Sequence, residues 1–186
     1  GNGLFAARAW WILRWAGVQD VHILDGGFAA WDREGLPTVA GPGGLVVPRE
    51  IELAAGSLPA ATMDDVRAFE GLLIDARGAR RFEGRREILD LRAGHIPGAQ
   101  NLPVNDLFDQ ETGKVKDGDV VRDRFARLGV TQNTDPASVI TYSGSGNHSA
   151  LLLAAMEQAG LPLLTHYVGG WSQWSANRDN PVATDM

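Results

Sequence analysis

A short β-branched run passes through a glycine-containing loop directly into a helical pattern, in the stretch VITYSGSGNHSALLLAAM at residues 139–156. The run ends at Tyr142, and the helical pattern of small and apolar residues begins near Ser149. Strands that lead into helices in this way build α/β folds, in which a buried parallel sheet is covered by helices. This unit restricts the fold more than any other feature of the chain.

The same alternation extends along most of the sequence. Residue patterns predict helices at 63–70, 118–128, 149–159 and 171–177, a further short helix beginning at 105–108, and strands at 72–75, 99–103, 138–142 and 164–168. Thr62 is the expected N-cap of the first of these helices, with Asp64 and Asp65 in its first turn. We therefore expect an α/β fold with a parallel sheet flanked by helices on both faces. Ligands of such sheets bind beyond the carboxyl ends of the strands, where the loop at 143–148 lies.

A repeat relates the two ends of the chain. The segment GGFAAW at 26–31 and the segment GGWSQW at 169–174 are separated by 143 residues (169 − 26), and the same offset relates Ala16-Gly17 to Ala159-Gly160. Such self-similarity indicates a tandem duplication. We expect residues 1–36 to be the C-terminal portion of a first copy, with a helix at 4–16, a strand at 21–24 and a brief helix after Gly26-Gly27. Residues 37–60, rich in proline and glycine, are the expected linker, and residues 61–186 are expected to form the complete second copy.

The first residue of the chain falls just after the position that would match Ser143 in the first copy. We expect a fragment of a longer two-domain protein, cleaved or split at an exposed loop, with a companion N-terminal polypeptide. The alternative is a natural short N-terminal extension.

Composition excludes several classes of function. The chain of 186 residues has a net charge of −6, which disfavours a nucleic-acid partner or an anionic membrane surface. No apolar run reaches the roughly 18–20 residues that a membrane span needs. The chain has no cysteine, so it cannot carry out thiol chemistry as written. Its four histidines show no metal-ligand spacing. We expect no cofactor, no metal and no membrane partner, and a location in the cytoplasm.

The loop itself indicates an anion site. Gly144 and Gly146 let the backbone fold tightly and turn its amides inward, and the helix that follows adds a partial positive charge. The alternative interpretation is a simple connection. A hydrolase elbow fails because the required glycines are missing around Ser143 and Ser145, and no Walker sequence is present. A cysteine-phosphatase loop would need an arginine where Ser149 stands.

Five segments together carry a family resemblance: DGGFAAW (25–31), DARGARRFEG (75–84), RAGHIPGAQNLP (92–103), YSGSGNHSA (142–150) and YVGGWSQW (167–174). In these segments the chain resembles the rhodanese-type sulfurtransferases, specifically the tandem-domain thiosulfate and 3-mercaptopyruvate sulfurtransferases. The resemblance implies a rhodanese-like fold and a loop cysteine that takes sulfur from a donor as a persulfide. Ser143 stands at that cysteine position, and a serine hydroxyl cannot form the S–S bond. We expect an intact anion cradle without sulfur transfer. Two origins of Ser143 are open, a deliberate replacement and a naturally degenerate copy.

Arginines after the strand at 72–75 are the candidates for holding the donor. The resemblance selects Arg81, with Arg92 as the alternative, because a guanidinium binds an anion through two parallel hydrogen bonds. Arg77 is expected to pair internally with Asp75.

The residues around Ser143 bear on the choice of donor. By the resemblance, Gly144, Ser145 and Gly146 favour 3-mercaptopyruvate over thiosulfate, and Ser145 would orient the donor or relay a proton to it. Asn147 and His148 depart from the family's usual Val-Thr. His148 is either a local acid or base or a residue that begins the helix, and His95 is expected to hold a turn.

Two functions of different class follow. The first is a sulfurtransferase that moves sulfur from a small anionic donor to a thiol or cyanide acceptor, here with its nucleophile replaced. The second is a non-catalytic rhodanese-like binding or regulatory module in which Ser143 is native. A phosphatase-like or arsenate-type anion enzyme is disfavoured by the missing arginine.

Overall fold

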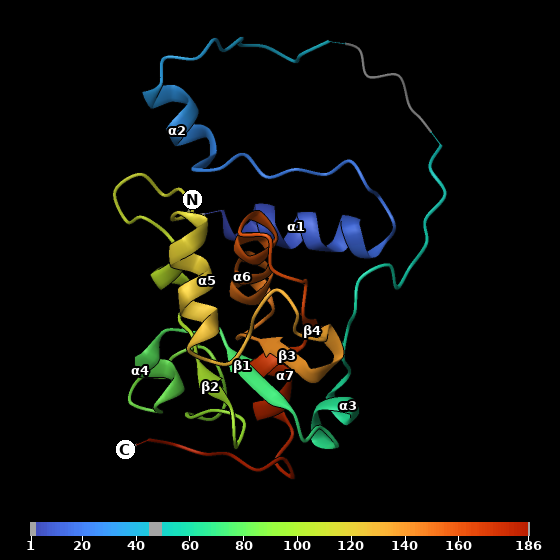
Figure 1. The fold of residues 1–186 in the computed structure, drawn as a ribbon, viewed down its shortest axis with the longest axis vertical. Helices are drawn as coiled ribbons and strands as arrows, with labels where there is room; N and C mark the ends of the chain where they lie inside the picture. The colour runs from blue at the N-terminus through green and yellow to red at the C-terminus, as the bar shows by residue number, and fades with distance from the viewer. Residues whose placement is uncertain (1–2, 45–49, 186) are drawn as a thin grey trace.

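A four-stranded parallel sheet is the centre of the computed structural model, which describes residues 3–44 and 50–185 (Figure 1). The strand order is β2-β1-β3-β4, and every neighbouring pair is parallel. The strands are β1 (Leu72–Asp75), β2 (Gln100–Asn101), β3 (Val139–Tyr142) and β4 (Thr165–Tyr167). The expectation of an α/β fold with a parallel sheet between helices is confirmed, although three of the four strands are shorter than their residue patterns predict.

Helices cover both faces of this sheet. The α-helices of the sheet domain are α3 (Met63–Arg67), α4 (Ala79–Phe82), α5 (Gly118–Ala126), α6 (Asn147–Gln158) and α7 (Gly170–Ala176). Two 3₁₀ turns, η1 (Val104–Leu107) and η2 (Pro136–Ser138), join them. Thr62 caps α3 as predicted: its side chain accepts from the amide of Asp65, whose carboxylate accepts in turn from the amide of Thr62.

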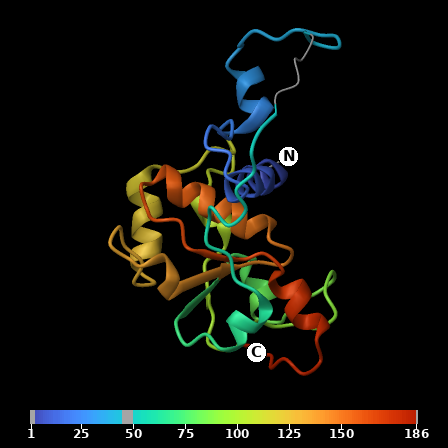
Figure 2. The same cartoon turned by 90° about the vertical axis from the view of Figure 1, so that its right-hand side faces the viewer.

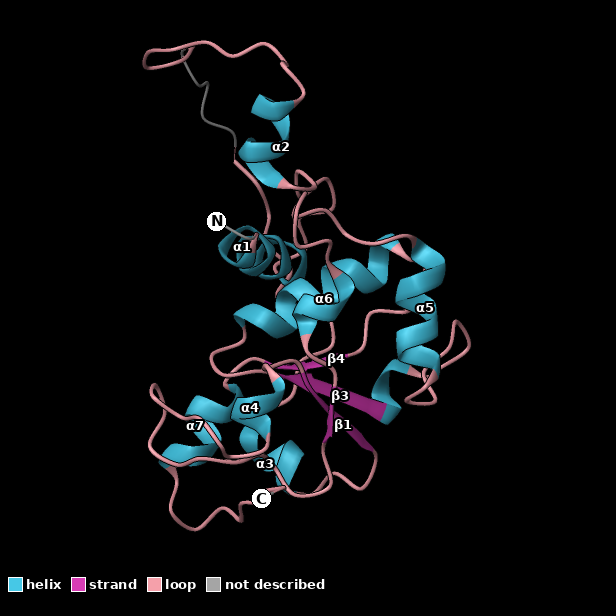
Figure 3. Cartoon of the chain, turned by 90° about the vertical axis from the view of Figure 1, so that its left-hand side faces the viewer, coloured by secondary structure: helices cyan, strands magenta, loops and turns pink. Residues whose placement is uncertain are grey.

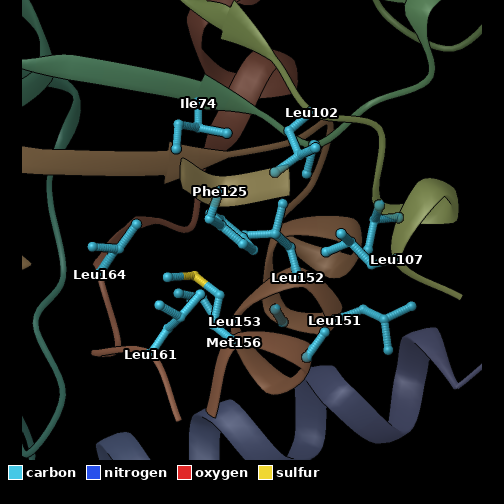
Figure 4. Close-up of a cluster of buried hydrophobic side chains, with 14 of the residues drawn as sticks. Ile74, Leu102, Leu107, Phe125, Leu151, Leu152, Leu153, Met156, Leu161 and Leu164 are labelled. Atoms are coloured by element: carbon cyan, nitrogen blue, oxygen red, sulfur yellow. The ribbon is translucent and has the colours of Figure 1, made fainter. Parts of the chain in front are cut away.

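The two faces have separate apolar cores because successive strand residues point to opposite sides. Ile74 and Val139 pack with α5 and α6, whereas Leu73 and Ile140 pack with α3 and α7. Figure 4 shows the first of these cores, in which Phe125 of α5 meets the buried leucines of α6 below Ile74. The loop that follows β3 therefore begins on a strand whose four residues are all buried.

Helix α1 (Leu4–Trp15) lies across α6 and completes the first core (Figures 1 and 3). Its side chains Ala7, Trp10 and Trp11 are buried in the same cluster as the α6 leucines. Burial of two tryptophans at about 25 cal/mol per Å² of apolar area makes this contact a substantial part of the stability. Helix α1 therefore packs directly against α6, the helix of the strand-loop-helix unit that contains Ser143.

Helix α2 (Gly27–Arg33) stands at the end of the molecule away from the sheet (Figure 2). It is held by hydrogen bonds from Arg33 to the carbonyls of Glu111 and Thr112 and by an ion pair between Glu34 and Lys114. The prediction of a strand at 21–24 is wrong, because these residues pair with no other strand in the described chain. A strand needs a neighbouring strand to satisfy its backbone groups, and residues 3–44 and 50–185 place none beside this segment.

Residues 50–61 return from α2 to the sheet and are bonded at two places. Ala54 and Ser57 donate their amides to the carbonyls of Ala16 and Trp15 at the end of α1, and the amide of Ala61 donates to the carbonyl of His166 in β4. Residues 54–61 are thereby fixed between α1 and the edge of the sheet.

The helices near the two ends of the chain match in length and spacing. Helices α1 and α6 each have 12 residues, and helices α2 and α7 each have 7. The first residues of both pairs are 143 positions apart (147 − 4 and 170 − 27). None of the helices in the described ranges is long and apolar enough to cross a bilayer.

Candidate functional site: the loop between β3 and α6

The loop begins at Ser143, at the carboxyl end of β3, and ends at Gly146, the N-cap of α6. Helix α6 starts at Asn147, two residues before the predicted start. Gly146 has φ 81°, and a Cβ at this position would lie 2.1 Å from Nη1 of Arg8 and 2.7 Å from the carbonyl oxygen of Val168. Only glycine fits there, because a side chain would be both strained and blocked.

The first two carbonyls of the loop point at α7. The amide of Trp171 donates to the carbonyl of Ser143 at 2.7 Å, and the amide of Ser172 donates to the carbonyl of Gly144 at 2.8 Å. This approach requires Gly170, since a Cβ there would lie 2.3 Å from the carbonyl oxygen of Ser143. The segment GGWSQW (169–174) thus serves to anchor the loop.

The next two carbonyls are also occupied from outside the loop. Arg8 of α1 donates to the carbonyl of Ser145 at 3.4 Å, and Ala150 donates its amide to the carbonyl of Gly146 at 3.1 Å. The chain has no cis peptide bond in its described part, so each amide points opposite to the preceding carbonyl. The amides of residues 144–147 therefore face away from these partners, toward the inside of the loop.

These amides have no acceptor within the described protein. None of the N–H groups of residues 144–149 donates to a backbone or side-chain atom there. The first turn of α6, a helix of 12 residues, adds the partial positive charge of its N-terminus at the same place. The loop consequently offers a set of backbone donors suited to an anion.

Ser143 itself is fully buried behind this set of donors. Its Oγ lies 3.1 Å from the Oγ of Ser149, and the Oγ of Ser149 lies 2.7 Å from Nε2 of His166. Sequence reasoning missed Ser149 and His166 as site residues. The available signal was the place of His166 in the strand predicted at 164–168. Placing this strand beside the strand that ends at Tyr142 requires the sheet order, which the sequence patterns do not supply.

His166 is an uncharged imidazole in the core. Its ring meets the ring of Trp11 at 4.6 Å and 84°, and its Nδ1 has no hydrogen-bond partner in the described chain. Burial, with a smaller contribution from the positive charge of Arg8, lowers the pKa of His166 to about 3. The side chain is therefore neutral near pH 7.

Arg81, the predicted donor-binding residue, lies beside the loop, but its charge is already shared with two carboxylates. Its Nε and Nη2 donate to Glu87 and its Nη2 also donates to Asp90 at 2.7 Å. Its Nη1 has no acceptor among the described residues and would lie 3.5 Å from a Cβ at Gly144. Two nitrogen atoms of the guanidinium, Nε and Nη2, are thus paired with carboxylates, and Nη1 is directed to the loop.

Glu87 fixes this arrangement. Burial alone would raise the pKa of Glu87, but hydrogen bonds from the amides of Leu89 and Asp90 and from Arg81 outweigh it and lower the pKa. The carboxylate is therefore ionised near neutral pH, and it holds Arg81 in a single orientation.

The remaining predicted loop residues differ in exposure. Ser145 is exposed at the mouth of the loop, and Asn147 and His148 are half-buried in the first turn of α6. Burial, together with the positive charge of Arg81, lowers the pKa of His148, with Asp75 acting in the opposite direction. His148 is therefore neutral near pH 7, the state that a local base needs and a local acid does not have.

Three further residues have structural roles outside the loop. Arg77 pairs with Asp75 at 2.7 Å, as expected, and both are buried. His95 bonds the carbonyl of Phe82 at 2.8 Å and stacks on its ring, so it is structural as expected, but it lies in a bridge with Ala183 and not in a turn. Arg92, the alternative donor-binding residue, instead donates to four carbonyls around the end of α7, those of Trp174, Ser175, Asn177 and Asn180.

Comparison with known proteins agrees with this architecture. The chain is 39% identical over 191 residues to the "Probable 3-mercaptopyruvate sulfurtransferase" of Pseudomonas aeruginosa, covering 99% of this chain and 65% of that protein. It is 36% identical over 195 residues to the 3-mercaptopyruvate sulfurtransferase of Escherichia coli K12, covering 98% of this chain and 65% of that protein. The chain thus spans about two thirds of the length of these relatives.

Solved structures share the fold. YnjE aligns with a TM-score of 0.85 at 25% identity, over 98% of this chain and 47% of that chain. An EanB variant in complex with ergothioneine aligns with a TM-score of 0.86 at 21% identity, over 98% of this chain and 46% of that chain. The family description "Rhodanese-like domain" matches residues 60–177, which include the whole sheet and the loop after β3. The chain therefore belongs to the rhodanese-like domain family.

Proposed function

We propose that the loop of residues 143–148 is the nucleophile loop of a sulfurtransferase and holds a negatively charged sulfur species. The observation that carries this proposal is the outward direction of four successive carbonyls, which leaves the intervening amides without acceptors inside the loop. Backbone donors of this kind stabilise an anion without any side chain having to be ionised.

Ser143 occupies the position at which sulfur would be carried. A thiolate there could attack the donor's sulfur, release the rest of the donor and become a persulfide. A second thiol or cyanide then takes up the outer sulfur of this persulfide, which breaks the S–S bond and restores the thiolate. A hydroxyl ionises far less readily and forms no S–S bond. The chain as written therefore binds the donor and does not transfer its sulfur.

The donor is a small anion, 3-mercaptopyruvate or thiosulfate. Arg81 offers Nη1 beside Gly144, and Ser145 offers an exposed hydroxyl at the mouth of the loop. Glycine at 144 and 146, with no basic side chain between them, favours 3-mercaptopyruvate, the donor named for the E. coli relative. Asn147 and His148 would contact the donor from the first turn of α6.

We also infer the domain arrangement: residues 1–36 form the C-terminal portion of a first copy, 37–60 a linker and 61–186 the second copy. The equal lengths and common spacing of α1 with α6 and α2 with α7 support this arrangement. A companion polypeptide that completes the first copy and a location in the cytoplasm stay predictions.

The test is the Ser143→Cys variant, assayed for sulfur transfer from 3-mercaptopyruvate and from thiosulfate to cyanide. We expect turnover with the variant and none with the starting chain. Ser145→Cys is the matched control, because it places a thiol two residues away on the exposed side of the loop. Equal activity of the two variants, or no persulfide on Cys at 143 by intact mass, would contradict the proposal.

A second function, a non-catalytic binding module, is favoured by one specific arrangement. Ser143 bonds inward to Ser149, and Glu87 and Asp90 neutralise much of Arg81. Thiosulfate binding by the starting chain, combined with an inactive Ser143→Cys variant that folds normally, would favour this alternative.

A further inference from the structure

Three buried polar side chains form a line behind the loop. Ser143, Ser149 and His166 each have 0% relative exposure, and their side-chain atoms are joined at 3.1 Å and 2.7 Å. We propose that Ser149, oriented by His166, donates a hydrogen bond to the atom carried at position 143 and so stabilises negative charge there. This inference rests on the proposed function and adds a side-chain donor to the ring of amides.

The direction of the hydrogen bonds follows from the free nitrogen of His166. Its Nδ1 has no partner, whereas its Nε2 contacts Ser149. A buried N–H without an acceptor is rarer and more costly than an unpaired acceptor. The ring proton therefore lies on Nε2, and Nδ1 carries the lone pair.

This tautomer fixes what Ser149 can do. With Nε2–H donating to its oxygen, the hydroxyl of Ser149 has its own proton left for the atom at position 143. Burial keeps His166 uncharged over the working pH range, so the pair supplies a hydrogen bond without adding a charge. His166 is thus a positioning residue, and Ser149 makes the contact.

Other charged and titratable groups surround the same position. Arg8 of α1 donates to the carbonyl of Ser145, Arg81 and Asp90 lie near Gly144, and His148 is in the first turn of α6. The buried Asp75 and Arg77 pair lies at the carboxyl end of β1, beside β3. Replacing Ser149 changes none of these groups, so a comparison with and without its hydroxyl isolates the proposed hydrogen bond.

The absence of cysteine from the chain makes the measurement clean, because Ser143→Cys introduces the sole thiol. Its pKa is read from the pH dependence of the ultraviolet absorbance of the thiolate, which needs neither a sulfur donor nor access of a reagent to the buried position. Adding Ser149→Ala is expected to raise this pKa by about one unit, which is about ten-fold less thiolate at neutral pH, since hydrogen bonds to charged groups have roughly that strength. His166→Leu should act in the same direction, and His166→Gln, which keeps a donor, should restore most of the effect.

Ser175→Ala is the matched control. Ser175 is another buried serine, its hydroxyl has no partner in the described residues, and it lies at the far end of α7. It should leave the thiol pKa unchanged. An unchanged pKa with Ser149→Ala, in a folded protein, would overturn the proposal even if Ser143→Cys proves active in sulfur transfer. A raised pKa would support it even if that variant transfers no sulfur.

A second measurement needs no variant. The ¹⁵N resonances of the His166 ring in the native chain report which nitrogen carries the proton. We expect the proton on Nε2, with Nδ1 unprotonated. A proton on Nδ1 would mean that Ser149 donates to the ring instead and has no proton for position 143, which would overturn the proposal.

Discussion

The amide of Trp171 donates to the carbonyl of Ser143 at 2.7 Å, which joins the start of α7 to the first residue of the loop. This bond turns the first peptide of the loop so that the amide of Gly144 faces inward. The close approach depends on Gly170, whose φ is +55° and whose position leaves no room for a side chain.

Gly170→Ala should therefore damage the loop more than the fold. A methyl group would meet the carbonyl oxygens of Ser143 and Gly144 at 2.3 and 2.6 Å. We expect a loss of about 2–3 kcal/mol in the free energy of unfolding, from urea titration, because backbone strain and a steric clash add. Thiosulfate affinity, from calorimetry, should fall at least about ten-fold.

Gly27→Ala is the control for that substitution. Gly27 has a similar φ of +62° and stands at the matching position of α2, but nothing lies within 4 Å of its added Cβ. It should cost only about 1–2 kcal/mol and leave thiosulfate affinity unchanged. Equal effects on affinity from the two alanines would show that Gly170 has no special relation to the loop.

Arg81→Gln should weaken binding of thiosulfate by about ten-fold or more, since a charged hydrogen bond to the anion is lost. The loss is increased because Asp90 would then lie beside Gly144 without its counter-charge, and Glu87 would keep only its longer ion pair with Arg77. The neighbouring exposed arginine gives the control, Arg80→Gln, for which affinity should stay the same. Calorimetry at low and high salt separates this local effect from general screening; unchanged affinity with Arg81→Gln would remove Arg81 from the site.

Stability should fall in mild acid because of His166. Its pKa is lowered from an ordinary value of about 6.5 to about 3 in the folded protein, so the unfolded chain binds a proton that the folded protein does not. This contribution is fully present above pH 6.5 and is lost as the pH falls toward 3. Between pH 6.5 and 4.5 we expect a loss of about 2–3 kcal/mol from this group.

The difference between native chain and His166→Gln isolates the contribution, since the carboxylates are common to both. Urea titrations at several pH values should give a steeper decline for the native chain. His22→Gln is the control, because His22 is exposed. Parallel pH profiles for the native chain and His166→Gln would mean that His166 takes up its proton at the same pH in the folded and in the unfolded protein, which would contradict the lowered pKa.

Local patterns were sufficient to predict the main elements. The helix predicted at 4–16 is α1 (Leu4–Trp15), the strand predicted at 138–142 is β3, and the loop between β3 and α6 lies at the carboxyl edge of the sheet. These features depend on residue spacing within one element. The strand predicted at 21–24 failed because a strand also depends on its neighbour, which a local pattern cannot supply.

Contacts between distant segments were beyond the same reasoning. The hydrogen bonds between Ser149 and His166 and from Arg81 to Asp90 follow from sheet order and from the path of irregular chain after α4. Each residue taken alone is an ordinary serine, histidine or carboxylate. Helix α4, which carries Arg81, has only four residues and gives no detectable periodicity.

The amides inside the loop are the centre of the account, and titrating the native chain with thiosulfate while following its ¹H–¹⁵N amide resonances tests them most directly. The account predicts saturable downfield shifts of the amides of residues 144–149, with the amide of Trp171, already bonded to Ser143, changing little. Shifts scattered over the surface, or none in residues 144–149 at saturating thiosulfate, would contradict it.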